Sequence, residues 1–296
     1  MAERRHATPV VALVSHAGLP ELTDDDRLLA ASLGERGTRA VPVVWSDPDV
    51  DWLAYDAIVV RSCWDYFLRP DEFFVWLSCL QAQGARVFNS VRTLRWNADK
   101  FYLRDLETRG VPVVPTHWME SGATESLGDI RRRTGWSELV VKPAISGSAH
   151  ETWRASPGAE SVDDLRLGAM TASGGVLVQP LVDVIAGDGE WSIVFIDGAY
   201  SHAVLKRPRT GDFRVQIENG CTFEALEPPD AVIAQAREAL DAAPERETML
   251  YARVDGCVVG DQLLLMELEL IEPVLFLGTS PGAADRLADA VLARLD

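Results

Sequence analysis

Three carboxylates near the end of the sequence, Asp255, Glu267 and Glu269, stand in a stretch that is otherwise apolar. They belong to LYARVDGCVVGDQLLLMELELIEP, residues 250–273. Like charges in such surroundings repel one another and lose hydration, so they stay ionised only when a cation lies between them. Oxygen ligands of this kind favour magnesium or manganese. The pattern therefore predicts a site for a divalent metal ion.

The same stretch predicts two strands joined by a hairpin at Gly260-Asp261. With a period of two, one face of the first strand carries Tyr251, Arg253 and Asp255, and the other carries Ala252 and Val254. On the returning strand we expect one face to carry Leu263, Leu265, Glu267 and Glu269. An alternative is that the acids line a solvated face or pair with arginines. Solvent-facing strands, however, seldom place leucine and isoleucine around each acid.

Two lysines stand where phosphate could bind. Lys142 ends the apolar strand ELVVKP and precedes the loop AISGSAHET, while Lys100 begins a helix that Gly110 ends. An ammonium group and the free N–H groups of a Ser/Gly loop can surround a phosphate. On spacing alone, ordinary surface lysines are the simpler interpretation.

A third group of polar and aromatic residues follows a strand near the start of the chain. The sequence RSCWDYF contains Arg61, Ser62, Trp64, Asp65 and Tyr66. A guanidinium can bind a carboxylate with two hydrogen bonds and Asp65 can hold an amine, which together suit an amino-acid zwitterion. The alternative is an ordinary loop with buried aromatic rings and a surface ion pair.

The first part of the chain alternates strands and helices. We expect strands at 10–15, 40–45, 57–62 and 86–89, and helices at 23–37 and 71–84. Such alternation is typical of βαβ units with a parallel sheet. The first strand is not followed by GxGxxG, so a dinucleotide site is poorly supported.

Composition limits the function classes. The chain has 296 residues, of which 47% are hydrophobic and 25% charged, and 28 basic against 45 acidic residues give a net charge of −17. This charge argues against a nucleic-acid partner. Without a long apolar run or a signal peptide, we expect a cytoplasmic protein with no membrane partner. The spacings of Cys63, Cys79, Cys221 and Cys257 match no zinc or redox motif, so these thiols are expected to stay reduced.

Several of these motifs, taken in order, resemble the ATP-grasp carboxylate–amine ligases, which include D-alanine:D-alanine ligase and glutathione synthetase. The order is a lysine, V-K-P, a Ser/Gly loop, the Q-P strand VLVQPLVD, GE, GDFR, RVD and E-x-E. Isolated coincidences would rarely reproduce that order. The resemblance rests on motifs beyond about residue 95 and on fold pattern before it.

The resemblance implies an α/β ATP-grasp fold with an amino-terminal parallel βαβ domain. The expected segments are a substrate-side domain at 1–95, a central lid subdomain at 96–182 and a metal-binding, catalytic subdomain at 183–296. It also implies ATP and two Mg²⁺ ions, with Mn²⁺ as an alternative, held by Asp255, Glu267 and Glu269. Glu269 replaces the asparagine usual in the family, and Glu272 is a candidate substitute ligand.

The family's nucleotide contacts map onto a larger set of residues. They are Lys100, Lys142, Ser146, Gly147, Ser148, Ala149, Gln179, Leu181, Val182, Asp183 and Glu190. Gln179 replaces the glutamate common in this hinge strand. The residues implied in catalysis are Arg253, Lys142 and Arg214, and Lys206 and Arg207 are candidates for contact with the transferred anion.

The implied activity is phosphorylation of a small amino-acid carboxylate by ATP, followed by attack of a nitrogen nucleophile. The motifs VVRSCWDY, LRWNADKFYLRDL and LMELELIEP resemble the cyclo-ligases of D-cycloserine biosynthesis, which close O-ureido-D-serine into a ring. In that interpretation Arg61, Ser62, Trp64, Asp65 and Tyr66 bind the substrate. The alternatives are intermolecular ligation of an amino acid or peptide, or an ATP-binding module without catalysis. A homo-oligomer is left open.

Overall fold

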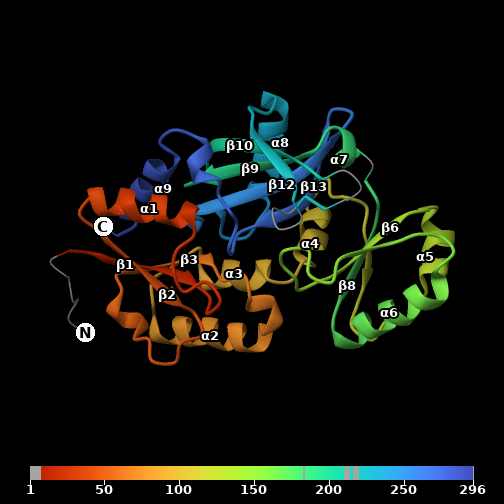
Figure 1. The fold of residues 1–296 in the computed structure, drawn as a ribbon, viewed down its shortest axis with the longest axis horizontal. Coiled ribbons are helices and arrows are strands. Elements are labelled where there is room, and N and C mark those ends of the chain that lie inside the picture. Colours follow the sequence, from red (N-terminus) through yellow and green to blue (C-terminus); the bar gives the residue numbers. More distant parts are fainter. Residues whose placement is uncertain (1–7, 183, 210–213, 216–219, 296) are drawn as a thin grey trace.

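The protein is built from three β-sheets that follow one another along the chain, as a computed structural model shows (Figure 1). The first sheet lies within residues 10–88, the second within 117–180 and the third within 190–269. Each sheet falls inside one of the three expected segments, and the expected α/β fold with a parallel amino-terminal sheet is confirmed. The structure describes residues 8–182, 184–209, 214–215 and 220–295.

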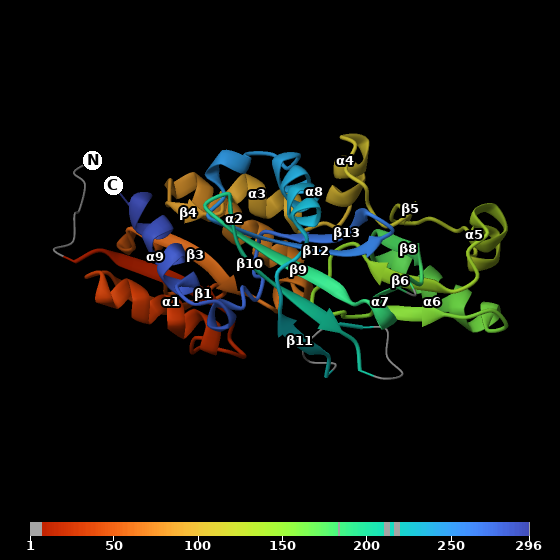
Figure 2. The ribbon, with the colours of Figure 1, turned by 90° about the horizontal axis from the view of Figure 1, so that it is seen from above.

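The first sheet is parallel, with the strand order β2-β1-β3-β4. Its strands are β1 (Val10–Ser15), β2 (Arg39–Val44), β3 (Ala57–Ser62) and β4 (Val87–Phe88). One face is covered by α1 (Asp24–Glu35) and α9 (Ala283–Ala293), the other by α2 (Pro70–Gln83) and α3 (Val91–Asn97) (Figures 1 and 2). Val11 and Leu13 pack in the core beneath α1 and α9. The alternate residues Ala12 and Val14 pack in the core beneath α2 and α3, so both apolar faces are covered.

Helix α1 begins where the sequence predicts. The Thr23 hydroxyl accepts a hydrogen bond from the N–H of Asp26 at 3.0 Å, and three acids occupy the first turn. Both features stabilise a helix amino terminus. The helix packs against α9, which comes from the far end of the chain. The carboxyl-terminal helix thus completes the core of the amino-terminal unit.

The second sheet is antiparallel, with the order β5-β8-β6-β7. Its strands are β5 (His117–Met119), β6 (Leu139–Pro143), β7 (Trp153–Ala155) and β8 (Val176–Pro180), and its helices are α5 (Leu127–Thr134) and α6 (Glu160–Ser173). Leu139 and Val141 pack in one core with both helices. Val140 and Lys142 alternate with them and therefore line a pocket on the opposite face.

The third sheet is antiparallel, with the order β11-β10-β9-β12-β13. Its strands are β9 (Glu190–Ile196), β10 (Ala199–Arg207), β11 (Thr222–Ala225), β12 (Tyr251–Val259) and β13 (Gln262–Glu269). Its helices are α4 (Tyr102–Thr108), α7 (Val184–Gly187) and α8 (Asp230–Asp241). Ala252 and Val254 of β12 share a core with α4 and α8. Arg253 and Asp255 line the pocket on the other face, as the period of two predicts.

The predicted hairpin between β12 and β13 is confirmed and turns at Gly260, whose φ is +63°. Asp255 lies directly opposite Glu267 in the register. Two carboxylates from neighbouring strands therefore stand side by side.

One prediction for β13 is wrong. Leu263 and Leu265 do not share a face with Glu267 and Glu269, because a β-bulge shifts the register and leaves Met266 without a partner on β12. The two leucines pack in the core with α8, whereas both glutamates line the pocket. The bulge thus reverses the strand's alternation where the acidic residues begin.

The longest described helices, α2 and α6, contain 14 residues each. A helix needs about 20 apolar residues to cross a bilayer. None of the helices in the described ranges is long and apolar enough to do so.

Candidate active site

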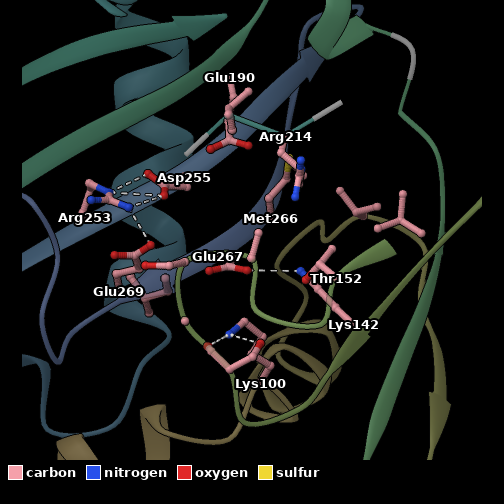
Figure 3. A pocket seen from close by; sticks show the side chains of 18 of the residues that line it. Lys100, Lys142, Thr152, Glu190, Arg214, Arg253, Asp255, Met266, Glu267 and Glu269 are labelled. Carbon is pink, nitrogen blue, oxygen red and sulfur yellow. Dashed lines mark hydrogen bonds and ion pairs between the residues drawn. The ribbon is translucent and has the colours of Figure 1, made fainter. Parts of the chain in front are cut away.

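One pocket gathers most of the residues that the sequence singles out (Figure 3). Strands β6, β9, β10, β12 and β13 contribute to it, with the turn before α4 and the loops after β3, β6 and β8. The predicted residues on its wall are Trp64, Tyr66, Lys100, Lys142, Ser146, Gly147, Ser148, Ala149, Gln179, Leu181, Val182, Glu190, Arg214, Arg253, Asp255, Glu267 and Glu269. Asp183 lies outside the described residues.

The charges on this wall are balanced. Its carboxylates are Glu190, Asp255, Glu267, Glu269 and Glu272, and its cations are Lys100, Lys142, Lys206, Arg214 and Arg253. The sequence contains three lysines in all, and every one of them is buried in this pocket. An ammonium group is a compact charge with three rotatable donors and suits phosphate oxygens. The placement of all three lysines here favours an anionic ligand.

Asp255 is the most firmly held of the carboxylates. Arg253 donates to it from Nε to Oδ1 at 2.9 Å and from Nη2 to Oδ2 at 2.8 Å, and the Ser192 hydroxyl donates at 2.6 Å. Burial opposes ionisation, but the charges of Arg253 and Lys206 outweigh it and hold the pKa of Asp255 below its ordinary value. The residue is therefore an anion at neutral pH. Ser192 was missed, although a period of two places it on the same face of β9 as Glu190.

Glu267 and Lys142 point toward one another across the pocket (Figure 3). The Lys142 Nζ lies 3.2 Å from the Glu267 Oε1. Burial raises the pKa of Glu267, but Lys100 and Lys142 more than compensate, so the pKa is lowered overall. This carboxylate is also ionised, and it stays accessible because its side chain is 28% exposed.

The remaining acids on the wall differ in their protonation. Burial, with the charges of Asp255 and Glu267, raises the pKa of Glu269 to about 8, although Arg253 donates to it at 2.5 Å. Glu190 pairs with Lys206 at 2.6 Å, and burial raises its pKa. The pocket thus combines acids that are ionised with acids whose ionisation depends on a neighbouring cation.

The donor set fits a hard cation only in part. Within the described ranges, no group of three or more His, Cys, Asp or Glu side chains is arranged to hold a metal ion. Asp255 and Glu267 offer carboxylate oxygens from opposite positions of the hairpin. Glu269, the third predicted ligand, accepts a hydrogen bond from Arg253 on one oxygen, Oε1. The same arginine donates to both oxygens of Asp255, so the two acids share one cation.

The loop after β6 lies over Lys100. The Lys100 ammonium donates to the carbonyl of Ser146 and, at 3.2 Å, to its hydroxyl. Gly147 sits against Phe67, since an added Cβ would lie 2.9 Å from the ring. Ser148 and Ala149 adopt φ values of +48° and +55°, which side-chain-bearing residues rarely do. Position 147 needs glycine because the chain approaches the Phe67 ring closely there.

The residues predicted for the nucleotide hinge lie at the end of β8, on the pocket wall. The Gln179 amide donates to the Thr116 hydroxyl at 2.8 Å, and the N–H of Leu181 donates to the carbonyl of Glu138 at 2.9 Å. Apolar residues that the sequence did not single out complete this end of the pocket, namely Val140, Ile185, Met266 and Leu268. An apolar slot next to hydrogen-bonding backbone is typical of a site for a planar base.

The expected substrate cluster is divided by the structure. Trp64 and Tyr66 line the pocket, but Arg61 and Ser62 do not. Arg61 is 2% exposed, and its Nε donates to Asp26 at 2.8 Å; the Ser62 hydroxyl donates to the same carboxylate. Arg61 does not line the pocket, and its guanidinium is paired with Asp26 in the core, so the geometry gives that prediction no support.

Asp65 also points away from the pocket. Its carboxylate accepts hydrogen bonds from the Trp45 indole at 2.7 Å and from Arg69 at 2.6 Å. The structure therefore does not place Arg61 and Asp65 together around a site for a zwitterion. Arg207 likewise lies outside the pocket wall, with Glu224 at 3.9 Å.

The residues that hold the pocket wall were not evident from the sequence. Residues 270–276 follow β13 as a strap, in which each carbonyl from Leu270 to Leu275 accepts a hydrogen bond from a side chain. In chain order the six side chains are Asn89, Tyr251, Trp64, Arg61, Arg253 and His202. Arg61 and Trp64 thus position this strap, and the strap presents Glu272, Val274 and Phe276 to the pocket.

Comparisons with known proteins show which family the sequence matches. A family model described as the N-terminal domain of the D-cycloserine synthetase DcsG matches residues 11–89. The cycloserine biosynthesis protein DcsG of Streptomyces lavendulae is 30% identical over 297 residues, covering 97% of this chain and 99% of that protein.

Solved structures are similar over the same length. The crystal structure of D-cycloserine synthetase DcsG has a TM-score of 0.86 and 29% identity, covering 97% of this chain and 100% of that one. The D-alanine–D-alanine ligase of Bacillus anthracis, complexed with ATP, has a TM-score of 0.70 and 16% identity, covering 97% of each chain. The second similarity concerns the fold alone.

Proposed function

Since the chain belongs to the ATP-grasp ligase family that includes the cycloserine biosynthesis protein DcsG, we propose that it couples ATP cleavage to C–N bond formation on a small amino acid. The observation that carries the proposal is the opposed pair Asp255 and Glu267, with three lysines and Arg253 around it. Mg²⁺ bound to these carboxylates would neutralise phosphate charge. The five carboxylates and five cationic side chains of the wall balance one another, so the pocket can accept ATP together with the metal ions that neutralise its phosphates.

The chain's own residues supply binding and orientation. Lys100 and Lys142 hold the phosphates in line with the substrate carboxylate, and the loop at Ser146 excludes water. Arg253 stabilises the oxyanion that forms when nitrogen attacks the acyl phosphate. No protein nucleophile is required, because the phosphoryl group moves directly to the substrate. These roles for the lysines and Arg253 do not require the metal site to be fully formed before ATP binds.

We propose that the nitrogen nucleophile belongs to the same molecule as the carboxylate, as in the closure of O-ureido-D-serine to D-cycloserine. The relatedness to DcsG along nearly the whole chain supports this choice. Intermolecular ligation by the same chemistry is the second candidate, and a non-catalytic ATP-binding module is the third. Two Mg²⁺ ions, Mn²⁺ as a substitute, and a cytoplasmic location remain part of the proposal.

Incubation of the protein with O-ureido-D-serine and Mg-ATP is expected to yield cycloserine. The acyl carbon gains a bond to the nitrogen that is attached to oxygen and loses its bond to phosphate. One water molecule then hydrolyses the carbamoyl group from that nitrogen, which releases carbon dioxide and ammonia. Mass spectrometry should detect the ring, with one ADP and one phosphate released for each ring closed. If ADP forms only after a second amine is added, ligation is intermolecular. If no ADP forms with any amino acid, the result supports the third candidate, an ATP-binding module without catalytic activity.

Lys142→Ala should weaken nucleotide binding by about ten- to a hundredfold, because one charge-assisted hydrogen bond is lost in a buried site. Calorimetry with a non-hydrolysable ATP analogue measures the dissociation constant. Arg154→Ala is the control and should bind normally, because the Arg154 side chain on the neighbouring strand β7 is exposed and pairs with Glu138. An unchanged constant for Lys142→Ala would mean that this lysine does not contact phosphate.

A further inference from the structure

Glu272 enters the pocket from the strap, whose carbonyls from Leu270 to Leu275 are all hydrogen-bonded to side chains. The carbonyl of Glu272 accepts a hydrogen bond from the Trp64 indole at 2.9 Å, and the next carbonyl, of Pro273, accepts one from Arg61 at 2.9 Å. On the other side of the Glu272 Cα, the carbonyl of Ile271 accepts a hydrogen bond from the Tyr251 hydroxyl at 2.8 Å, so the strap is held on both sides. The Glu272 side chain is therefore presented to the pocket in a defined direction.

The carboxylate of Glu272 differs from its neighbours in having no cation of its own. The other four acids of the wall are bound by Lys142, Lys206 or Arg253. Among the described residues, Glu272 forms no ion pair. Lys100, the cation that most lowers its pKa, donates instead to Ser146.

The surroundings of Glu272 are suited to a small organic cation. Its neighbours on the wall include Trp64, Tyr66 and Phe67, and its Oε1 lies close to Gly147, at 3.8 Å from the position of an added Cβ. Aromatic faces attract cations, whereas they offer no oxygen ligands to a metal ion. Burial raises the pKa of Glu272 to about 7, so the anion is costly here until a cation pairs with it.

We propose that Glu272 binds the ammonium group of the amino-acid substrate. The inference rests on the proposed function and names the residue that selects an α-amino acid over a simple carboxylic acid. With its ammonium on Glu272, the substrate lies between the aromatic wall and Arg253, and its carboxylate faces Lys142 and the phosphates. The same residue was considered above as a substitute metal ligand, and the two roles predict different defects.

The test compares wild type with Glu272→Gln, using ADP release with a panel that contains O-ureido-D-serine, D-serine and the proteinogenic amino acids. The glutamine keeps the shape and removes the charge. The KM for the accepted amino acid should rise on the order of a hundredfold, because a buried charge pair is lost. The KM for ATP and the Mg²⁺ dependence should not change. Glu272→Asp, which keeps the charge, should recover part of the affinity.

A des-amino analogue gives a second readout. For 3-(ureidooxy)propanoic acid, which lacks only the ammonium group of O-ureido-D-serine, wild type and Glu272→Gln should have equal KM values. The control Glu107→Gln, an exposed change on α4, should behave as wild type with every compound. Matching thermal unfolding of the variants shows that the fold is kept.

The outcomes separate the two proposals. If wild type accepts O-ureido-D-serine and Glu272→Gln has an unchanged KM for it, the inference is overturned and the proposed cyclisation stands. A shift in Mg²⁺ dependence alone makes Glu272 a metal ligand and also overturns the inference. If wild type accepts another amino acid but not O-ureido-D-serine, the proposed cyclisation is wrong. The role of Glu272 is then tested by comparing the KM of wild type and Glu272→Gln for the accepted amino acid. Failure with the whole panel overturns both.

Discussion

Glu267→Gln is expected to lower kcat by about a thousandfold, equivalent to about 4 kcal/mol of transition-state stabilisation. Glu267 lies opposite Asp255 and is one of the two carboxylates placed to hold a cation on the phosphates. The amide keeps the size of the side chain but loses the negative charge that a hard metal ion requires. ADP release at saturating ATP and Mg²⁺ measures the effect.

The fold should survive this change. The Glu267 side chain is 28% exposed, and its loss leaves Lys142 near other acids of the pocket. The thermal midpoint of Glu267→Gln should therefore stay close to that of wild type, and Glu107→Gln serves again as the matched control. Normal turnover by Glu267→Gln at saturating magnesium would contradict the assignment of Glu267 to the metal site.

Arg61→Met should destabilise the protein by about 3–5 kcal/mol, because it leaves Asp26 as an uncompensated charge in the core. Arg61 and Asp26 are 2% and 1% exposed, and their Nε–Oδ1 distance is 2.8 Å. Arg61 also holds the carbonyl of Pro273, so the strap loses one of its six anchors. The midpoint of urea unfolding, with an unchanged m-value, reports the loss.

Arg132→Met is the matched control, since that arginine forms an exposed pair with Asp129 and should contribute less than about 1 kcal/mol. In the double variant Arg61→Met, Asp26→Leu, part of the stability should return because no charge stays buried alone. A stable Arg61→Met protein with a raised KM for the amino acid would contradict this account. It would return Arg61 to the role that the sequence motif predicts, binding of the substrate carboxylate.

The tertiary structure changed the interpretation of RSCWDYF more than that of any other motif. Arg61 and Asp65 are residue types that bind zwitterions, and their spacing in the sequence gave no sign that each already had a partner. Those partners, Asp26 and Arg69, lie on α1 and at the start of α2. A charged side chain after a strand can serve a ligand or the fold, and only its neighbours decide between them.

The scarcity of lysine in the sequence is a further signal for the proposed phosphate site. The chain contains 28 basic residues, of which only Lys100, Lys142 and Lys206 are lysines. All three line the pocket, including Lys206, which the resemblance makes a candidate for contact with the transferred anion. Where arginine serves nearly every other need for a cation, the few lysines mark the place that needs a compact charge.

The sequence by itself determined the family, the alternation of faces on β12 and the pairing of Asp255 with the returning strand. These follow from the order of motifs and from local periodicity, which act over a few residues. The bulge at Met266 and the strap were decided by tertiary structure alone. The bulge depends on how β13 pairs with β12, which the spacing of residues in β13 alone does not specify. The hydrogen bond from Arg61 to the Pro273 carbonyl of the strap joins residues 212 positions apart. Hydrogen-bond partners that far apart leave no periodic trace in the chain, because folding rather than spacing brings them together.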